Sequence, residues 1–207
     1  MLPDRNLKSP SPPSAEPGTV LLDTERLILR RFMAFDAPSL AVAANHTSIF
    51  NNLRDRMPSP YTLADAEAYV NGLGERASVY PNHVGIFLKP NTLDNPSAES
   101  VLIGSVGIKP GDDVAYRSWE LGYWVTPPAW GKGYATEAVG AFVRWIFVTW
   151  PSLNRIEAQA YGHNTGSAGV LTKCGFTKEG VKRGSVEKCG VILDEMLFGI
   201  VRSDLGL

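Results

Sequence analysis

Alternating apolar and polar positions along the chain predict a series of short β-strands. The first strand begins within residues 21–24 and continues through Leu27 and Leu29, which alternate with Arg26 and Arg30. A period of two is typical of a strand that buries one face. The same criteria predict strands over residues 84–88, 101–109, 119–125 and 155–161, and a last hairpin joining about 177–182 to about 193–201.

Apolar spacings of three and four predict four helices between these strands. Thr62 and Asp65 hold the first and fourth positions of a capping box, and Asn164 and Gly175 are residues favoured at the two ends of a helix. The predicted helices cover residues 34–50, 62–77, about 134–150 and 164–174. About seven strands and four helices in this mixed order predict an α/β sandwich on a mixed sheet.

The chain length suits one domain with a short tail. Residues 1–18 contain five prolines and three serines between them, and this composition predicts a disordered or extended segment. The remaining residues, 19–207, are predicted to form a single domain, with residues 90–100 as a long loop between two strands.

Composition narrows the classes of partner. The formal net charge is -1, so the chain lacks the basic surplus expected of a protein that binds nucleic acid or an anionic membrane, and no apolar run is long enough to span a membrane.

Cys174 and Cys189 form no disulfide framework, which predicts a reduced, cytoplasmic setting. Cys174 falls on an apolar helix position, so we interpret it as a core residue in preference to a nucleophile. The three histidines lie on separate segments without paired metal-ligand spacing, and no metal is expected.

The most informative segment is Gly131-Lys132-Gly133, between a predicted strand and a predicted helix. Two glycines at a helix start let the backbone approach a ligand, and the helix dipole adds partial positive charge there. The segment therefore predicts an anion site, and the alternative is a simple strand-to-helix turn. The spacing and the residue after Lys132 exclude a Walker A loop, and Thr136 stands where a dinucleotide fingerprint needs its third glycine.

Three segments in order resemble the RimJ/RimL-like branch of the GNAT superfamily of N-acetyltransferases. Residues 130–138, Trp-Gly-Lys-Gly-Tyr-Ala-Thr-Glu-Ala, align with its acyl-CoA loop, although Trp130 replaces the usual Gln or Arg. Residues 24–30 resemble the first strand of that branch, and residues 164–176 resemble its Asn-x-x-Ser and Lys-x-Gly-Phe segment. The resemblance implies a GNAT-type sandwich with a central, mostly antiparallel mixed sheet.

The same resemblance implies acetyl-CoA as the acyl donor. Its pyrophosphate would meet the loop, and its pantetheine arm would pair with the end of the preceding strand. Asn164 matches a family asparagine that contacts the cofactor, and Ser167 matches a serine proposed to hydrogen-bond or protonate the departing thiolate. Asn164 is equally explained as a helix cap. The expected acetyl-CoA contacts are Tyr123, Trp124, Val125, Thr126, Trp130, Gly131, Lys132, Gly133, Tyr134, Ala135, Thr136, Asn164 and Ser167.

Glu120 is the candidate general base, at a strand position where several family members place a catalytic glutamate. Burial among Trp119, Leu121 and the following aromatic residues would raise the pKa of its carboxyl group, and the alternative role is a cross-strand ion pair. The implied activity is direct acetyl transfer to a primary amine, either a protein N-terminal α-amine or a small molecule, by a monomer or homodimer. A non-catalytic acyl-CoA sensor and a transferase for another acyl-CoA are the alternatives.

Overall fold

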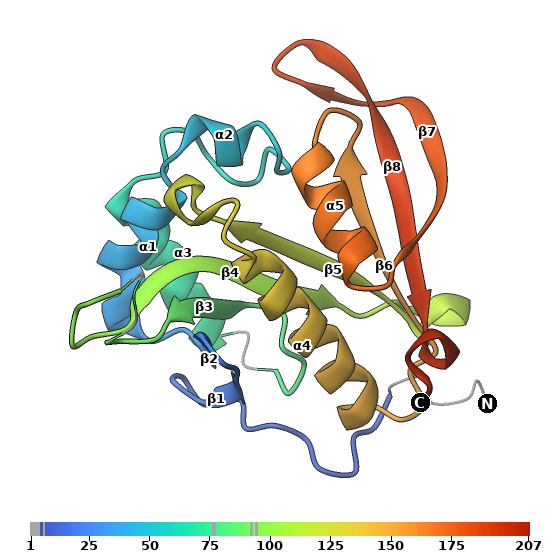
Figure 1. Ribbon diagram of the computed structural model, residues 1–207, viewed down its shortest axis with the longest axis horizontal. Helices are drawn as coiled ribbons and strands as arrows, with labels where there is room; N and C mark the ends of the chain where they lie inside the picture. The colour runs from blue at the N-terminus through green and yellow to red at the C-terminus, as the bar shows by residue number, and fades with distance from the viewer. Residues whose placement is uncertain (1–4, 6, 76–77, 92, 94) are drawn as a thin grey trace. The chain divides into compact units, whose positions relative to one another are not determined.

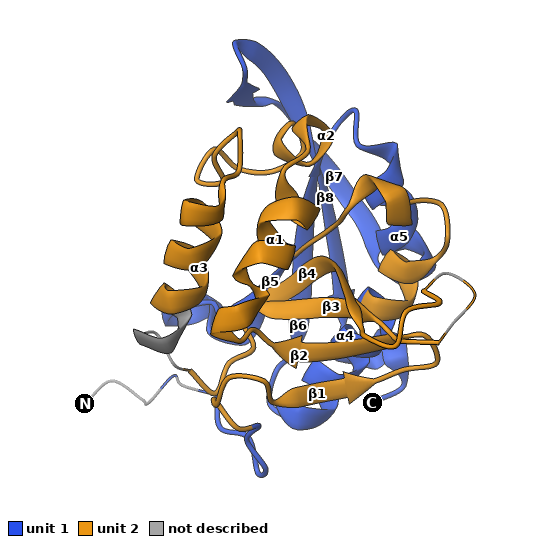
Figure 2. Ribbon diagram, turned by 90° about the vertical axis from the view of Figure 1, so that its left-hand side faces the viewer, with its two compact units in different colours: residues 1–13, 108–122, 139–207 blue, residues 14–107, 123–138 orange. Residues whose placement is uncertain are grey.

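The computed structural model describes residues 5, 7–75, 78–91, 93 and 95–207. Two compact units are distinguished in Figure 2. Unit 1 comprises residues 1–13, 108–122 and 139–207, and unit 2 comprises residues 14–107 and 123–138. No helix in the described part of the chain is long and apolar enough to cross a membrane.

Unit 2 contains four antiparallel strands in the order β1-β2-β3-β4 (Figure 1). Leu27 and Leu29 are fully buried in the second strand, as their alternation with arginines predicts. The third strand is buried along its whole length, which explains its uninterrupted apolar run. The bounds are β1, Val20–Asp23; β2, Leu27–Arg31; β3, Val84–Leu88; and β4, Val101–Lys109.

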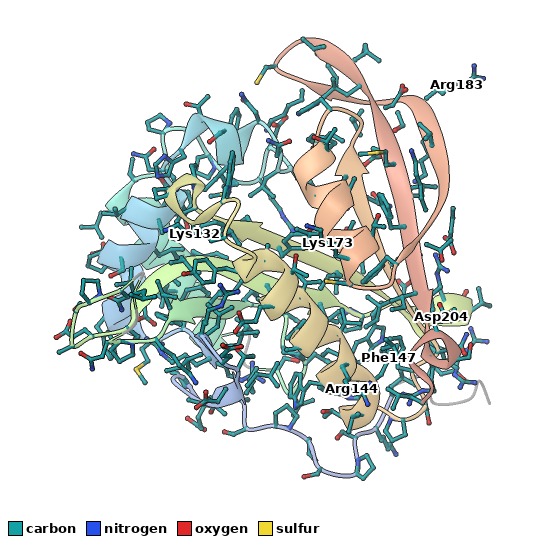
Figure 3. The ribbon with its side chains drawn as sticks, viewed as in Figure 1. Lys132, Arg144, Phe147, Lys173, Arg183 and Asp204 are labelled. Carbon is teal, nitrogen blue, oxygen red and sulfur yellow. The ribbon has the colours of Figure 1, made fainter. Side chains whose placement is uncertain are left out.

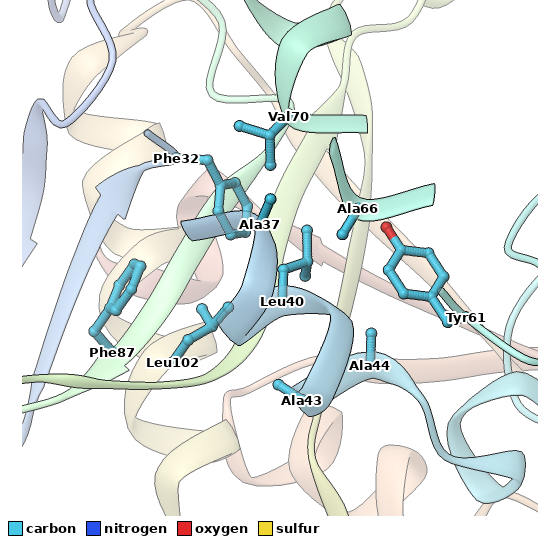
Figure 4. Packing of buried hydrophobic residues seen from close by; sticks show 10 residues of the cluster. All are labelled: Phe32, Ala37, Leu40, Ala43, Ala44, Tyr61, Ala66, Val70, Phe87 and Leu102. Atoms are coloured by element: carbon cyan, nitrogen blue, oxygen red, sulfur yellow. The ribbon is translucent and has the colours of Figure 1, made fainter. Parts of the chain in front are cut away.

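Helices α1 (Ala37–Ala44) and α3 (Leu63–Glu75) pack on one face of these strands (Figure 4). Their small and branched residues meet Phe87 and Leu102 from the sheet, and Phe32 just after β2, in one buried cluster. Trp124, from the last residues of β5 (Ser118–Val125), is partly buried against the same cluster. The apolar faces predicted from sequence therefore form the core of this unit.

Unit 1 contains the first residues of β5 together with β6 (Arg155–Tyr161), β7 (Thr177–Lys188) and β8 (Val191–Val201). β5 and β6 are parallel, whereas β8 is antiparallel to both β6 and β7. Its aromatic core includes Trp119 and Trp150, whose ring centroids lie 5.1 Å apart in an edge-to-face arrangement. The helices are α4 (Tyr134–Thr149), which begins in unit 2, and α5 (Thr165–Lys173), which contacts β6 and β7.

The described residues form eight strands and five α-helices, and the predicted mixed, mostly antiparallel fold is confirmed. The extra strand arises because a turn after Asp23 divides the predicted first strand in two. Thr24 closes this turn, since its N–H donates to the carbonyl of Leu27 at 2.9 Å. The extra helix arises because Asn45 leaves the helical conformation, with φ -79° and ψ 66°, and separates α1 from α2 (Thr47–Phe50).

The described part of residues 1–18 contains no helix or strand, but it makes specific contacts. The side chain of Leu7 is buried, and the carbonyl of Ser14 accepts a hydrogen bond from Nε of Arg31 at 2.7 Å. Disorder of the tail and the domain boundary at residue 19 stay predictions.

Candidate functional site

The glycine loop is fixed at the point where it leaves β5 in unit 2. The N–H of Thr126 donates to the carbonyl of Ile103 at 2.7 Å, and a single 3-10 turn, Pro127–Ala129, follows. Nε1 of Trp130 then donates to the carbonyl of Val125 at 2.6 Å, although about half of this residue's surface is exposed. The tryptophan that departs from the family pattern thus holds the loop to the strand through its indole.

Both glycines of the loop adopt left-handed backbone conformations, with φ 74° at Gly131 and 82° at Gly133. An L-residue with a side chain adopts this region at a cost, so glycine is required by the backbone. A Cβ atom at Gly131 would meet nothing within 4 Å, which means that the position is open. Gly131, Lys132 and Gly133 are all exposed, and Figure 3 shows Lys132 on the loop ahead of α4.

This arrangement fits an anionic ligand. The loop leads into a helix of 16 residues, and the carbonyl of Gly133 accepts the N–H of Glu137 at 3.0 Å as the helix begins. The first turn of a helix directs N–H groups and partial positive charge outward, which favours a phosphate at that end. Exposed glycine backbone at such a turn suits the pyrophosphate of an acyl-CoA.

An ion pair that the sequence analysis missed ties this loop to the β1–β2 turn. Nε of Arg26 donates to Oε2 of Glu137 at 2.7 Å, and Nη1 donates to the carbonyl of Lys132 at 3.0 Å. Burial raises the pKa of Glu137, but hydrogen bonds from Thr24 and Arg26 outweigh it and leave that pKa below its usual value. Arg26 and Glu137 both lie in segments that carry the family resemblance. That fact was the signal in the sequence from which a contact between them could have been suspected.

The other predicted loop contacts are placed as follows. Tyr134 is buried, and the Arg26 guanidinium lies over its ring at 4.6 Å from the centroid, so the tyrosine packs inside the loop. Ala135 and Thr136 are half-buried in the first turn of α4. At the end of β5, Tyr123 and Trp124 are half-buried, whereas Val125 and Thr126 are buried.

Glu120 lies in the part of β5 that belongs to unit 1, and its side chain is half-buried. Its neighbours Trp119 and Leu121 are buried, because alternation along a strand directs them to the other face. Trp119 and Leu121 therefore face away from the carboxylate, and the role of Glu120 as a general base stays a prediction. In the parallel pairing of β5 with β6, the residue opposite Glu120 is Glu157.

Asn164 and Ser167 lie together at the start of α5, also in unit 1. Oδ1 of Asn164 accepts a hydrogen bond from the backbone N–H of Ser167 at 3.0 Å, so the predicted helix cap is confirmed. Both residues are half-buried. The cap occupies the side-chain oxygen of Asn164 and the backbone N–H of Ser167, and the hydroxyl of Ser167 is a separate group.

The cysteine and histidine side chains considered in the sequence analysis have the following surroundings. Cys174 is half-buried, and burial raises the pKa of its thiol to about 11, which agrees with a core role. His83 is within 2.7 Å of the hydroxyl of Tyr69, measured from Nδ1. Among the described residues no three His, Cys, Asp or Glu side chains form a group that could hold a metal.

Comparison with known proteins agrees with this geometry. The profile of a family described as acetyltransferase (GNAT) domain matches residues 26–177. The uncharacterized N-acetyltransferase YoaA of Bacillus subtilis is 29% identical over 185 residues, which cover 88% of this chain and 97% of YoaA. The probable N-acetyltransferase YjcK, also of Bacillus subtilis, is 35% identical over 122 residues, or 59% of this chain and 62% of YjcK.

Solved structures show the same fold. Mycobacterium smegmatis RimJ in complex with CoA-disulfide superposes with a TM-score of 0.71 at 25% identity, covering 87% of this chain and 84% of RimJ. The ribosomal-protein-S5-alanine acetyltransferase from Vibrio fischeri gives a TM-score of 0.73 at 22% identity, covering 88% of this chain and 97% of that protein. The left-handed glycine loop and these matches together show that the chain belongs to the GNAT acetyltransferase family, with RimJ/RimL ribosomal-protein acetyltransferases among its structural neighbours.

Proposed function

We propose that the protein is an acetyl-CoA-dependent N-acetyltransferase that transfers the acetyl group directly to a primary amine in a ternary complex. The observation that carries the proposal is the exposed loop at residues 131–133, with its two left-handed glycines at the start of α4. The structure of the related RimJ in complex with CoA-disulfide supports a CoA-type ligand. We place the reaction in the cytoplasm.

The proposed chemistry assigns one role to each candidate group. The loop binds the pyrophosphate, and the amine nitrogen attacks the thioester carbonyl carbon to form a tetrahedral intermediate. Glu120 takes the proton that the amine loses, directly or through a water molecule. When the intermediate collapses, the C–S bond breaks and the sulfur receives a proton from the hydroxyl of Ser167, which recovers one from solvent. A free thiol has a pKa of about 8.5, so a weak acid is sufficient for this step.

The proposed acceptor is a protein N-terminal α-amine or a small-molecule amine. An α-amine has a pKa of about 7.7–8.0, whereas a lysine amine has one of about 10.4. A much larger fraction of an α-amine than of a lysine amine is neutral near pH 7, so less deprotonation by the general base is needed. The solved neighbours named as ribosomal-protein acetyltransferases support a peptide acceptor.

The test is incubation of the purified protein with acetyl-CoA and a panel of amines, peptides with free N-termini and aminoglycosides. CoA release and acceptor mass are followed together. A gain of one acetyl group on one acceptor class, together with CoA release, is the expected result. Binding of acetyl-CoA without transfer to any member of a broad panel would contradict catalysis and favour the sensor alternative.

A pair of glycine variants tests the loop itself. Gly133→Val is expected to weaken acetyl-CoA binding, because it adds a branched side chain at φ 82° on the ligand-facing loop. Gly190→Val is the matched control, since Gly190 has φ 78° and open space around it but lies between β7 and β8. Equal acetyl-CoA affinity in the two variants would contradict the assignment of the loop.

Two further variants test the catalytic roles. Glu120→Gln is expected to lower kcat by about 10²–10⁴-fold, the usual contribution of a general base, and Ser167→Ala is expected to slow thiolate departure. Acetyl-CoA affinity measured in the absence of acceptor is the control for Glu120→Gln. Unchanged turnover in both variants would refute the mechanism while leaving the family assignment intact.

A further inference from the structure

The segment Thr24-Glu25-Arg26 has no part in the proposed chemistry, yet Thr24 and Arg26 contact Glu137 at the start of α4, and Arg26 also contacts the glycine loop of unit 2. Thr24 and Arg26 belong to the turn between β1 and β2. Glu137, in the first turn of α4, is 111 residues from Arg26 in sequence. Contacts over such a separation arise only from the tertiary fold, so the β1–β2 turn helps to hold the start of α4 and the loop before it.

Glu137 receives three hydrogen bonds from this turn. Oε1 accepts from Oγ1 of Thr24 at 2.7 Å and from the backbone N–H of Arg26 at 2.9 Å, and Oε2 accepts from Nε of Arg26 at 2.7 Å. The exposed fractions of the two side chains in the ion pair are 36% for Arg26 and 17% for Glu137. A carboxylate with three donors in a half-buried setting has its orientation fixed.

The same guanidinium holds the loop on both sides of Gly133. Nη1 donates to the carbonyl of Lys132 at 3.0 Å, and the guanidinium carbon lies over the ring of Tyr134 at 4.6 Å from its centroid. A Cβ atom at Gly133 would lie 3.4 Å from Nη2 of Arg26, so the side chain is in van der Waals contact with the glycine position. Arg26 thus contacts the residue before Gly133, the space beside it and the residue after it.

Charge gives this arrangement a second consequence. Glu137 lies in the first turn of α4, where its negative charge suits the helix dipole but repels a phosphate approaching the same turn. The guanidinium of Arg26 places a compensating positive charge directly on this carboxylate. A loop that receives an anion therefore keeps its helix-stabilising glutamate without the full electrostatic repulsion.

We infer that Arg26 is a positioning residue for the acyl-CoA pyrophosphate: through Glu137 and the carbonyl of Lys132 it holds the glycine loop in its binding conformation and offsets the charge of Glu137. The inference rests on the proposed function, since it assigns a ligand to the loop. It gives a role to the Thr24–Arg26 segment that the chemistry leaves unexplained.

The experiment compares binding of CoA with binding of pantetheine, which has no pyrophosphate, to the full-length chain. Affinities are measured by isothermal titration calorimetry, with pantetheine as a competitor of CoA. The variants are Arg26→Ala, Arg26→Lys, Glu137→Gln and the double variant Arg26→Ala/Glu137→Gln. Arg144→Ala is the matched control, because Arg144 is an exposed arginine further along α4 (Figure 3).

Arg26→Ala is expected to weaken CoA binding at least about tenfold, the scale of one hydrogen bond to a charged group, while pantetheine binding stays unchanged. The double variant is expected to regain part of the CoA affinity because the uncompensated carboxylate is gone. If Arg26 had a purely structural role, Arg26→Ala would lower the affinities for CoA and pantetheine together. Arg26→Lys keeps the charge without the forked donors, so its CoA affinity is expected to lie between those of wild type and Arg26→Ala.

The outcomes separate the two proposals. Wild-type protein that does not bind CoA would overturn the loop assignment and this inference together. Wild-type protein that binds CoA, with Arg26→Ala binding it equally well, would overturn the inference alone. If Arg26→Ala does not fold, Glu137→Gln and Arg26→Lys decide the question, and unchanged CoA affinity in both would refute the positioning role.

Discussion

Replacement of Asn164 by alanine gives a direct measure of how α5 is held. The helix is only nine residues long, and helices of this length are marginal without tertiary contacts and caps. Oδ1 of Asn164 accepts the N–H of Ser167 at 3.0 Å, which satisfies one of the N–H groups that the helix leaves unpaired. Alanine removes this acceptor, and the N–H then depends on water.

The expected loss is about 1 kcal/mol, within the usual range of about 0.5–2 kcal/mol for removing an N-cap side chain. For a chain of about 200 residues, 1 kcal/mol corresponds to a change in Tm of about 2–4 °C. Thermal unfolding followed by far-UV circular dichroism measures the shift. The other end of α5 keeps its own closure, since the N–H of Phe176 donates to the carbonyl of Leu171 at 3.0 Å.

Asn164→Asp is the matched control. Aspartate caps a helix as well as asparagine does, and its charge suits the N-terminal end of the helix dipole, so its Tm is expected to equal or exceed that of wild type. An unchanged Tm in Asn164→Ala would refute the cap as a source of stability.

Two further predictions follow from shifted pKa values. Cys174, whose thiol pKa is raised to about 11 by burial, is expected to be about one-thousandth thiolate at pH 8 and to resist iodoacetamide, whereas the exposed Cys189 is alkylated. Peptide mass spectrometry after brief labelling checks this, and equal labelling would contradict the burial of Cys174. Glu137 has a folded-state pKa below its unfolded value of about 4.3, so its stabilising contribution is complete above that pH and is lost as pH falls through the folded-state pKa. The Tm difference between wild type and Glu137→Gln is therefore expected to be present at pH 7 and to shrink in acid; a difference that grows in acid would contradict the sign.

Features of the fold that depend on neighbouring residues could be predicted from sequence. The capping box at Thr62 and Asp65 is confirmed by reciprocal hydrogen bonds of 2.8 and 3.2 Å between each side chain and the other residue's backbone N–H. The predicted closure of α5 at Gly175 is also confirmed, since Gly175 adopts the left-handed conformation with φ 90°. Strand β6 has the predicted bounds, because its alternation is regular from end to end. In each case the interacting groups lie within a few residues of one another.

One prediction failed because of a contact between distant segments. The helix predicted over residues 34–50 is broken at Asn45, whose Oδ1 accepts the N–H of Tyr61, 16 residues away, at 3.0 Å. The apolar spacing of the segment suits a continuous helix, but residues 45–48 are weaker helix formers, and the tertiary hydrogen bond of Asn45 holds the break. At Glu120 the alternation of the strand decides the surroundings, because its sequence neighbours Trp119 and Leu121 face the other side of the sheet.

The glycine loop shows the limit of a local motif in another way. Glycine gives the loop the left-handed conformations that it needs, but the same freedom makes an isolated loop costly to order. Contacts beyond the glycines reduce this cost: Trp130, within the motif, donates its indole N–H to the carbonyl of Val125, and Arg26, from a distant turn, donates to the carbonyl of Lys132. The motif therefore predicts a class of ligand, whereas the order of the loop also depends on Arg26, which the motif does not contain. Arg26 and Glu137 both lie in segments that carry the family resemblance, but their hydrogen bond becomes visible only in the fold.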